Sequence, residues 1–357
     1  MRKLRAVGVG NRWATFLQSY LSAREAVVIV EGSFSAPFVI KNMIFQGTVL
    51  GPPLWNVSFQ DVARFIENIG FRGVRFADDL SVFKKFDVHM NTDVVMGELH
   101  GAQQEVHAWG ASQQMTFDAG KEEFKVMHHI YASGSPFRFL GPILDTKLVG
   151  QAAVAKAAGK ARAKIKAILR CRSFYTVGEM ICQYKCHVLS LLESITGAIY
   201  HCSVTVLRPL DDLQRSFLRQ LGLPAEMAFL HYNLAPLALR RDIGMLGFLQ
   251  RATLGFVSPL VCALFPPASQ PATPARTRLQ WSRHPRQLLE RCDGQHCDFM
   301  RNSVFGLVNV YNRLPAAVVA TESIKLFQRS LIDIARAACR EQKLSWHAIF
   351  SPRVITA

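Results

Sequence analysis

The chain has 357 residues, half of them hydrophobic, and a formal net charge of +16 at pH 7. Such a hydrophobic content excludes a wholly disordered protein, and the length allows two or three domains. No run of about 18 apolar residues occurs, so the sequence predicts neither a transmembrane helix nor a membrane partner. The positive charge favours an anionic partner, most commonly nucleic acid, although membrane-surface and ribosome-associated proteins share this property.

The eight cysteines are scattered, and no apolar signal core follows the basic start Met-Arg-Lys-Leu-Arg. Scattered cysteines without a secretory signal are typical of reduced thiols in an intracellular protein. One small cluster, Cys292, His296 and Cys297, lacks the fourth ligand that a tetrahedral zinc site needs. The sequence therefore predicts an intracellular location, with the nucleus as one candidate compartment, and no structural zinc.

Hydrophobic periodicity predicts an α+β fold for the first part of the chain. We expect helices over residues 1–24, broken near Gly8 and Gly10, over 54–69, and over 93–109. Residues 26–30 and 38–44 read as strands around a Glu-Gly-Ser turn. Residues 124–128 and 137–144 are expected to complete one small sheet with the hairpin described next.

Residues 71–83, Phe-Arg-Gly-Val-Arg-Phe-Ala-Asp-Asp-Leu-Ser-Val-Phe, place two adjacent acids between two β-prone runs. This pattern predicts a β-hairpin with Asp78 and Asp79 at its tip. Two neighbouring carboxylates repel each other unless a cation lies between them, and Mg²⁺ commonly fills that role. The alternative is a solvated turn, because aspartate favours turns for its own local reasons.

Three sequence blocks, taken together, resemble the reverse-transcriptase domain of non-LTR (LINE-type) retrotransposons. The first is Phe-Ala-Asp-Asp at residues 76–79, which resembles the catalytic hairpin of that family. The second is Phe-Gln-Gly-Thr-Val-Leu-Gly-Pro-Pro-Leu-Trp-Asn at residues 45–56. The third is Phe-Arg-Phe-Leu-Gly-Pro-Ile-Leu-Asp at residues 137–145, which is similar to the primer-grip hairpin.

The resemblance implies RNA-directed DNA synthesis with Mg²⁺, or Mn²⁺ in its place, on an RNA template and a DNA primer with dNTPs. It implies that Asp78 and Asp79 are two of three metal-binding aspartates, and that Lys121 helps to protonate the leaving pyrophosphate. The remaining implied site residues contact nucleotide and template (Gln46, Gly47, Asn56 and Phe76) or form the primer grip (Phe139, Leu140 and Gly141).

The sequence departs from the family pattern in two places. Phe45 replaces the usual proline before Gln-Gly, which weakens the rigid turn there. The strand that carries the family's first catalytic aspartate is also missing, since residues 1–46 contain no Asp and only Glu25 and Glu31 as acids. The resemblance is therefore to a reverse transcriptase truncated at its N-terminus, with impaired activity expected.

Beyond residue 146 the chain becomes helical and basic, with eleven Lys or Arg against four acids over residues 151–220. Bases recur every four residues and form two neighbouring stripes of one predicted helix, Lys156, Lys160 and Lys164, and Arg162, Lys166 and Arg170. We expect Lys156, Lys160, Lys164, Lys166 and Arg170 to bind nucleic acid, as in a thumb subdomain. A charged, solvated helix face is the alternative.

The sequence thus predicts five segments. They are a partial reverse-transcriptase palm (1–145), a basic thumb-like helical region (146–225), a helical extension (226–264), a Pro-rich linker (265–280) and a C-terminal helical region (281–357). Three hypotheses remain open: an impaired reverse transcriptase, a catalytically dead nucleic-acid-binding remnant of a retroelement, and a decayed or partial gene product that does not fold stably alone.

Overall fold

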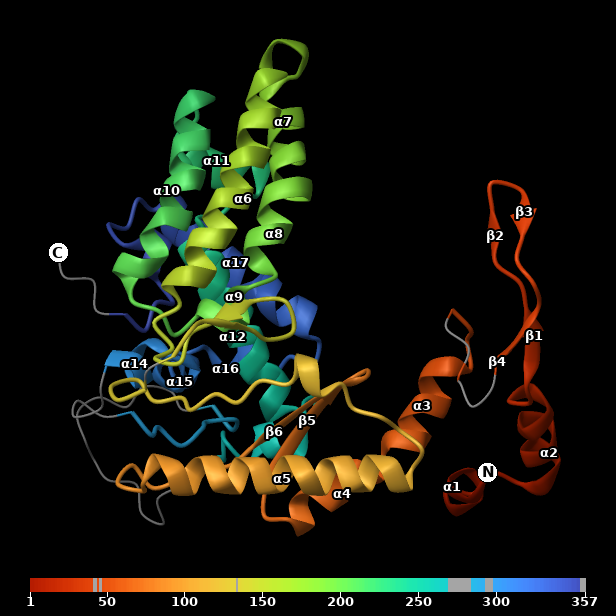
Figure 1. Cartoon of the computed structure of the whole chain (residues 1–357). Coiled ribbons are helices and arrows are strands. Elements are labelled where there is room, and N and C mark those ends of the chain that lie inside the picture. Colours follow the sequence, from red (N-terminus) through yellow and green to blue (C-terminus); the bar gives the residue numbers. More distant parts are fainter. Residues whose placement is uncertain (41–43, 45–46, 133, 269–283, 293–297, 354–357) are drawn as a thin grey trace. The chain divides into compact units, whose positions relative to one another are not determined.

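A computed structural model describes residues 1–40, 44, 47–132, 134–268, 284–292 and 298–353. The chain forms two compact units, Met1–Phe124 (unit 1) and Lys125–Ala357 (unit 2). Their boundary lies inside the segment predicted as the palm. Helices predominate, and the described strands pair in small antiparallel sheets, so the α+β class is confirmed (Figure 1). Most of the Pro-rich segment lies outside the described residues.

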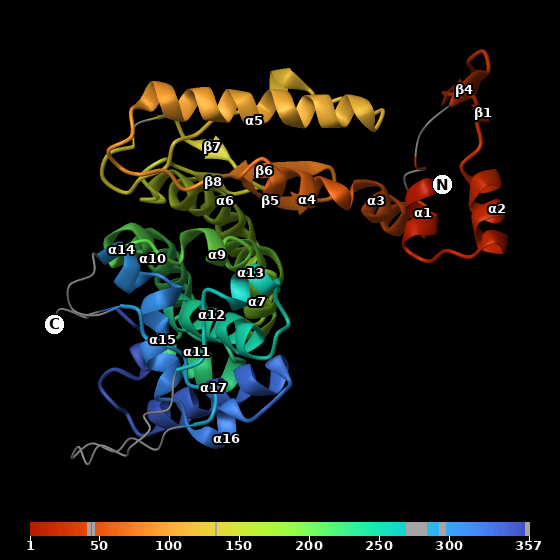
Figure 2. The ribbon, with the colours of Figure 1, turned by 90° about the horizontal axis from the view of Figure 1, so that it is seen from below.

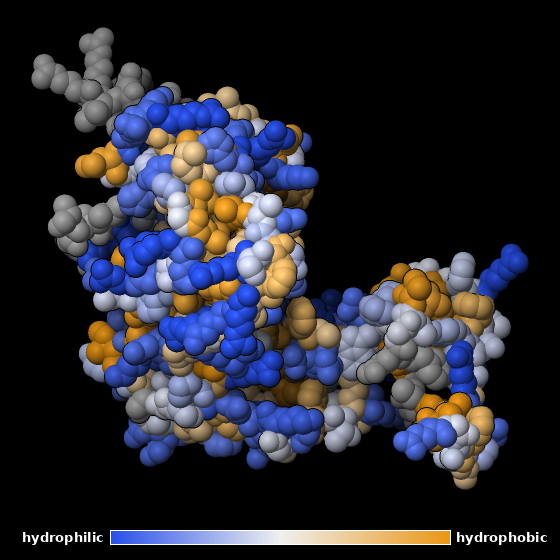
Figure 3. Space-filling view, turned by 90° about the horizontal axis from the view of Figure 1, so that it is seen from above, coloured by the Kyte–Doolittle hydropathy of each residue, from blue (hydrophilic) through white to orange (hydrophobic). Residues whose placement is uncertain are grey.

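Unit 1 begins with two helices and two short β-ribbons. The predicted helix break is confirmed, because α1 (Arg2–Ala6) and α2 (Asn11–Tyr20) are separated around Gly8, which has a φ of 88°. Strand β1 (Arg24–Ala26) pairs with β4 (Phe38–Ile40), and β2 (Ile29–Val30) pairs with β3 (Ser33–Phe34). These ribbons expose apolar side chains, visible as orange surface at the lower right of Figure 3.

The rest of unit 1 packs helices against one hairpin. Its elements are α3 (Gly51–Phe59), α4 (Asp61–Asn68), β5 (Arg72–Phe76), β6 (Asp79–Phe83), α5 (Thr92–Ser112) and the 3-10 turn η1 (Ala119–Lys121). Their shared core contains Phe59, Ile66, Phe71, Val106 and Trp109. The helix predicted over 54–69 begins earlier, with two prolines in its first turn, and is divided at Gln60.

The single small sheet predicted from the sequence is not formed within the described chain. Strands β5 and β6 pair only with each other, and so do β7 (Phe137–Arg138) and β8 (Ile143–Leu144). Residues 124–128, predicted as a strand, form no ladder with any of the described residues, although the N–H of His128 donates to the carbonyl of Thr146 at 3.0 Å. A strand needs a neighbour to satisfy its backbone groups, and sequence pattern alone does not show whether that neighbour is within reach.

Unit 2 is a helical assembly (Figure 2). Its helices are α6 (Gln151–Arg170), η2 (Arg172–Phe174), α7 (Val177–Tyr184), the π-helical η3 (Lys185–Leu189), α8 (Ser190–Glu193), α9 (Thr196–Ile199), α10 (Val204–Gln220), α11 (Ala225–Tyr232), α12 (Leu237–Thr253), α13 (Pro259–Cys262), α14 (Asp298–Asn302), α15 (Val304–Asn312), α16 (Ala316–Val319), α17 (Ile324–Arg340) and η4 (Trp346–Ala348). One core joins α6, α7 and α10 around Tyr184 and Phe217, and a second joins α12, α15 and α17 around Tyr311 and Phe327.

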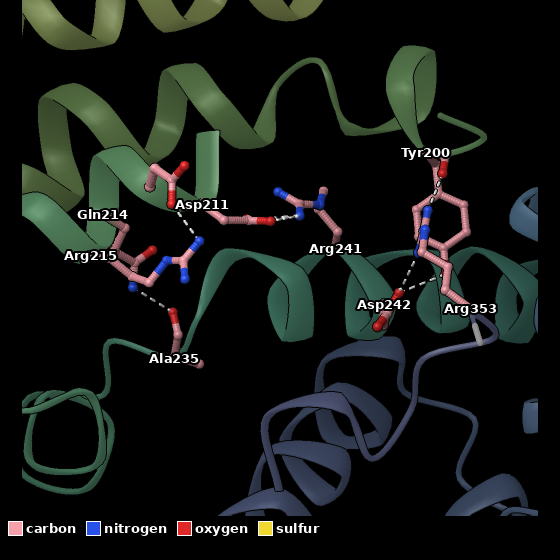
Figure 4. Close-up of polar contacts among 9 residues, drawn as sticks. Tyr200, Asp211, Gln214, Arg215, Ala235, Arg241, Asp242 and Arg353 are labelled. Carbon is pink, nitrogen blue, oxygen red and sulfur yellow. Dashed lines mark hydrogen bonds and ion pairs between the residues drawn. The ribbon is translucent and has the colours of Figure 1, made fainter. Parts of the chain in front are cut away.

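A buried polar network links three parts of unit 2 (Figure 4). Arg241 of α12 donates through Nη2 to both carboxylate oxygens of Asp211 in α10, at 2.8 and 2.9 Å. Next to it, Asp242 accepts a 2.8 Å hydrogen bond from the Tyr200 hydroxyl and lies 3.3 Å from Nη1 of Arg353. Burial raises the pKa of Asp242 to about 6, although the Arg353 charge opposes this rise. The Arg241–Asp211 ion pair joins α12 to α10, and the Asp242–Arg353 ion pair attaches residue 353 to α12.

Candidate functional site

The acidic hairpin forms one residue out of its predicted register. Strands β5 and β6 pair antiparallel from Arg72 opposite Phe83 to Phe76 opposite Asp79. The tip is therefore Ala77 and Asp78, while Asp79 is the first residue of β6. A two-residue hairpin turn needs a positive φ at its first position, and Ala77 supplies it at 54°. For a residue other than glycine this conformation costs about 1–2 kcal/mol.

Two hydrogen bonds fix this hairpin to α3. The indole Nε1 of Trp55 donates to the carbonyl oxygen of Ala77 at 2.8 Å. Nη1 of Arg75 donates to the carbonyl oxygen of Phe59 at 2.9 Å. Trp55 itself stacks on Phe59, with 5.3 Å between ring centroids. The strained turn is thus attached directly to α3, the helix that carries the second half of the Gln-Gly block (residues 45–56).

A cleft of about 1130 Å³ brings the first two sequence blocks together within unit 1. Asp78 and Ala77 of the hairpin line it, as do Gly47 and Asn56 from the 45–56 block. Gly47 has a φ of 78° with open space around its Cα, so the backbone can approach a ligand closely there. Arg2 also lines the cleft, a contribution that the sequence analysis missed because a basic N-terminus carries no site pattern.

Asp78 and Asp79 suit the binding of one hard cation better than the binding of two cations. Asp78 and Asp79 are both exposed, and neither has an ion-pair or hydrogen-bond partner for its side chain within the described residues. Mg²⁺ commonly binds through one or two carboxylates together with waters and substrate phosphates, which this pair can provide. However, only Asp78 lines the cleft. In the described parts of the chain, no three His, Cys, Asp or Glu side chains gather as a metal-binding group.

The other predicted residues of unit 1 lie apart from this cleft. Phe76 is exposed on β5, opposite Asp79 in the ladder. Lys121 is exposed in η1 and lies 3.1 Å from the carboxylate of Asp118, and this bond lowers the pKa of Asp118. Neither side chain lines the cleft. Gln46 lies outside the described residues.

The predicted primer-grip residues form a separate hairpin tip in unit 2. The backbone N–H of Phe139 donates to the carbonyl of Pro142 at 2.9 Å, closing the turn between β7 and β8. Leu140 and Gly141 occupy the turn with φ values of 47° and 110°. Leu140 is exposed. The hairpin predicted at residues 137–144 therefore exists, and its tip is available at the surface of unit 2.

The predicted nucleic-acid-binding bases all lie on α6 and are all exposed, namely Lys156, Lys160, Lys164, Lys166 and Arg170. They divide into two groups. Lys166 and Arg170 line a groove between α6 and α10, together with Arg162 and Arg172, whereas Lys156, Lys160 and Lys164 do not. Sequence reasoning missed Arg172 because it follows the helix end, where helical periodicity no longer applies.

Comparison with known proteins returned no match to any family model, any curated protein or any solved structure. None of the helices that the structure describes is both long enough and apolar enough to cross a membrane.

Proposed function

We propose that the chain is a reverse-transcriptase-like protein of the non-LTR retrotransposon type, acting in template-directed DNA synthesis on RNA with reduced activity. One observation carries the proposal: Asp78 of the Phe-Ala-Asp-Asp block shares a cleft with Gly47 and Asn56 of the Gln-Gly block. These residues come from separate elements of unit 1, and the resemblance assigns both blocks to one polymerase site. The expected partners are an RNA template, a DNA primer and dNTPs, in an intracellular setting with the nucleus as one candidate compartment.

Within this proposal the residues of the cleft have distinct roles. Asp78 would hold Mg²⁺ or Mn²⁺, with Asp79 beside it in the chain. When bound, such ions activate the primer hydroxyl and neutralise the developing phosphate charge. Asn56 offers amide donors and acceptors to the nucleotide, and Gly47 allows it to approach the backbone. Trp55 is a positioning residue, since its hydrogen bond holds the turn that bears Asp78.

The proposal includes reduced activity because the ligand set is short by one carboxylate. The two-metal route needs acidic groups that hold both ions. Residues 1–46 contain no aspartate. The described residues offer no third acid close to Asp78 and Asp79.

Primer extension tests the proposal. Purified full-length protein is given an RNA template, an annealed DNA primer, dNTPs and either Mg²⁺ or Mn²⁺. We expect slow extension by the wild type and none by the Asp78→Asn, Asp79→Asn double variant. Because only Asp78 lines the cleft, Asp78→Asn alone should reduce extension more than Asp79→Asn alone.

A matched control is available on the same unit. Glu67 and Glu105 are exposed acids of α4 and α5, so Glu67→Gln with Glu105→Gln makes the same change in net charge. This control should retain wild-type extension. Extension that survives the double aspartate variant would refute a role for the hairpin.

A nucleic-acid-binding protein without catalysis is the second candidate, and the missing third carboxylate favours it. It predicts salt-dependent binding of RNA or DNA that persists in EDTA. It also predicts that no primer is extended with either Mg²⁺ or Mn²⁺. Binding that is insensitive to salt would exclude it, because phosphate contacts release counterions.

A further inference from the structure

A groove on unit 2 gathers positive charge without any compensating acid. Its volume is about 770 Å³, and it runs between the C-terminal half of α6 and α10. Arg162, Lys166 and Arg170 of α6 line one wall, and Arg172 of η2 closes the end. Within the described chain none of these four side chains has an ion-pair partner, and none of the residues that line the groove is acidic.

The spacing of the cations suits a phosphate backbone. Arg162 and Arg170 are eight residues apart on one helix, which corresponds to about 12 Å at 1.5 Å per residue. A strand with duplex-like stacking carries one phosphate per about 3.4 Å of axis, so at most three or four phosphates fit along this length. Ser216 and Gln220 on the α10 wall add neutral hydrogen-bonding groups, and Leu213 adds an apolar surface between the walls.

Two exposed aromatic side chains follow Arg172 closely in the chain, although neither lines the groove itself. Phe174, in the same 3-10 turn as Arg172, is 82% exposed, and the following Tyr175 is 44% exposed. A large aromatic ring held almost fully in water has no packing role to explain it. Bases of a single strand stack on such rings, whereas a duplex keeps its bases stacked inside. An acidic peptide would use the cations but not the ring.

We propose that this groove binds single-stranded nucleic acid, with phosphates on Arg162, Lys166, Arg170 and Arg172 and a base stacked on Phe174. The inference deepens the proposed function by naming the form of nucleic acid that unit 2 takes, and it uses no residue of unit 1. The proposal assigns binding to only one of the two basic stripes of α6. The stripe of Arg162, Lys166 and Arg170 lines the groove, whereas the stripe of Lys156, Lys160 and Lys164 lies outside it.

Fluorescence anisotropy with a labelled 12-nucleotide oligouridylate tests this proposal on the full chain, in EDTA and without dNTPs. The groove variant carries Arg162→Gln, Lys166→Gln and Arg170→Gln. Loss of three phosphate contacts should weaken binding about 100-fold at about 0.1 M salt and reduce the slope of log K against log salt by about 2. The control variant carries Lys156→Gln, Lys160→Gln and Lys164→Gln, and so makes the same change in net charge. It should weaken binding no more than about threefold, because these lysines lie outside the groove and salt screens their interaction with the bound strand.

Phe174→Ala provides a second test that does not depend on charge. The side chain is exposed, so the variant should fold normally, and the loss of one stacked base should weaken binding about tenfold. Phe256→Ala, at another exposed phenylalanine of unit 2, should leave binding unchanged. Circular dichroism of all variants confirms that each retains the helical content of the wild type.

Several outcomes would overturn the proposal. Equal losses in the two triple variants would assign the binding to net charge, and no effect of Phe174→Ala would remove the base-stacking contact. Tighter binding of a 12-base-pair RNA duplex, or equally effective competition by polyglutamate, would identify a different partner. The Asp78→Asn, Asp79→Asn protein should bind like the wild type. A failure of primer extension therefore leaves this inference intact. A failure of binding would overturn this inference but would not decide the catalytic role of the hairpin, which primer extension tests.

Discussion

At the scale of single residues, the acidic hairpin is a strained turn held by its neighbours. Ala77 adopts a left-handed conformation that glycine takes more readily, and Trp55 donates to its carbonyl. Backbone strain of this kind persists where surrounding contacts fix it, and it often occurs at functional sites. The position of Asp78 in the cleft depends on this turn.

Ala77→Gly should therefore stabilise unit 1. Relief of about 1–2 kcal/mol of strain is partly offset by the greater flexibility of glycine in the unfolded chain, so we expect a net gain of about 0.5–1 kcal/mol. Urea unfolding, monitored by hydrogen exchange of the β5 and β6 amides, measures this change in the free energy of unfolding. Ala108→Gly, at an exposed position inside α5, is the control and should destabilise by a similar amount. A loss of stability in Ala77→Gly would contradict the strained turn.

The buried carboxyl of Asp242 predicts a pH dependence of stability. Its folded pKa of about 6 lies above the unfolded value of 3.8, so the folded state binds this proton more tightly. The protonated Asp242 carboxyl therefore adds to the free energy of unfolding. This contribution is fully present below pH 3.8 and is lost as the pH rises through 6. Between pH 4 and 7, the stability of the wild type relative to Asp242→Asn should fall by on the order of 2 kcal/mol. The fluorescence of Trp346, which stacks on Phe229 in the same unit, reports the unfolding. A difference that stays constant over this range would contradict the raised pKa.

At the scale of elements, the sequence predicted local structure well and pairing poorly. The Glu-Gly turn between the first strands, the break near Gly8 and the basic helix after residue 150 all follow from local rules, namely turn-forming residues and helical periodicity. The tip of the acidic hairpin shifted by one residue because either Ala77-Asp78 or Asp78-Asp79 can occupy a short turn. The expected common sheet failed because its strands are separated by long segments, and no local pattern specifies such distant pairing.

The same distinction applies to the candidate site. Motif resemblance selected Asp78, Gly47 and Asn56, which the fold brings to one cleft. It also selected Lys121 and Phe76, which lie elsewhere on unit 1 and do not line it. Arg2 and Arg172 belong to no motif, since their positions depend on tertiary packing. Trp55 lies in the 45–56 block, but the resemblance gave it no role, because its hydrogen bond to Ala77 also depends on tertiary packing. Their contributions became visible only once the helices and hairpins were placed.

The first β-ribbons are an exposed apolar surface with open strand edges. Val28, Val30 and Phe34 are all more than half exposed, and unpaired edges of this kind favour association between chains. Val28→Lys with Val30→Lys should reduce self-association, seen as a smaller concentration dependence in light scattering. Val49→Lys with Val94→Lys adds the same charge at exposed positions outside the ribbons. Equal effects of both pairs would assign the change to net charge.

At the scale of the whole molecule, each unit has hydrophobic cores of its own. Phe217 is fully buried in unit 2 and stacks on Tyr184, with 4.6 Å between ring centroids. Phe217→Ala should cost about 3–5 kcal/mol. We expect hydrogen exchange to accelerate in α6, α7 and α10 while α4 and α5 keep their wild-type rates. The reciprocal variant Ile66→Ala should accelerate exchange in unit 1 alone. Acceleration in both units from either substitution would show that they unfold together.

The division at Phe124 and Lys125 also has a consequence during protein synthesis. Domains generally fold in the order in which they leave the ribosome, at about 5–20 residues per second, so unit 1 is complete roughly 10–50 s before unit 2. Throughout that interval the apolar ribbons at residues 24–40 are exposed on a nascent chain, close to other nascent chains on the same messenger. Chaperones that bind emerging polypeptides would therefore act first on unit 1, and the yield of folded protein would depend on how fast the second half is translated.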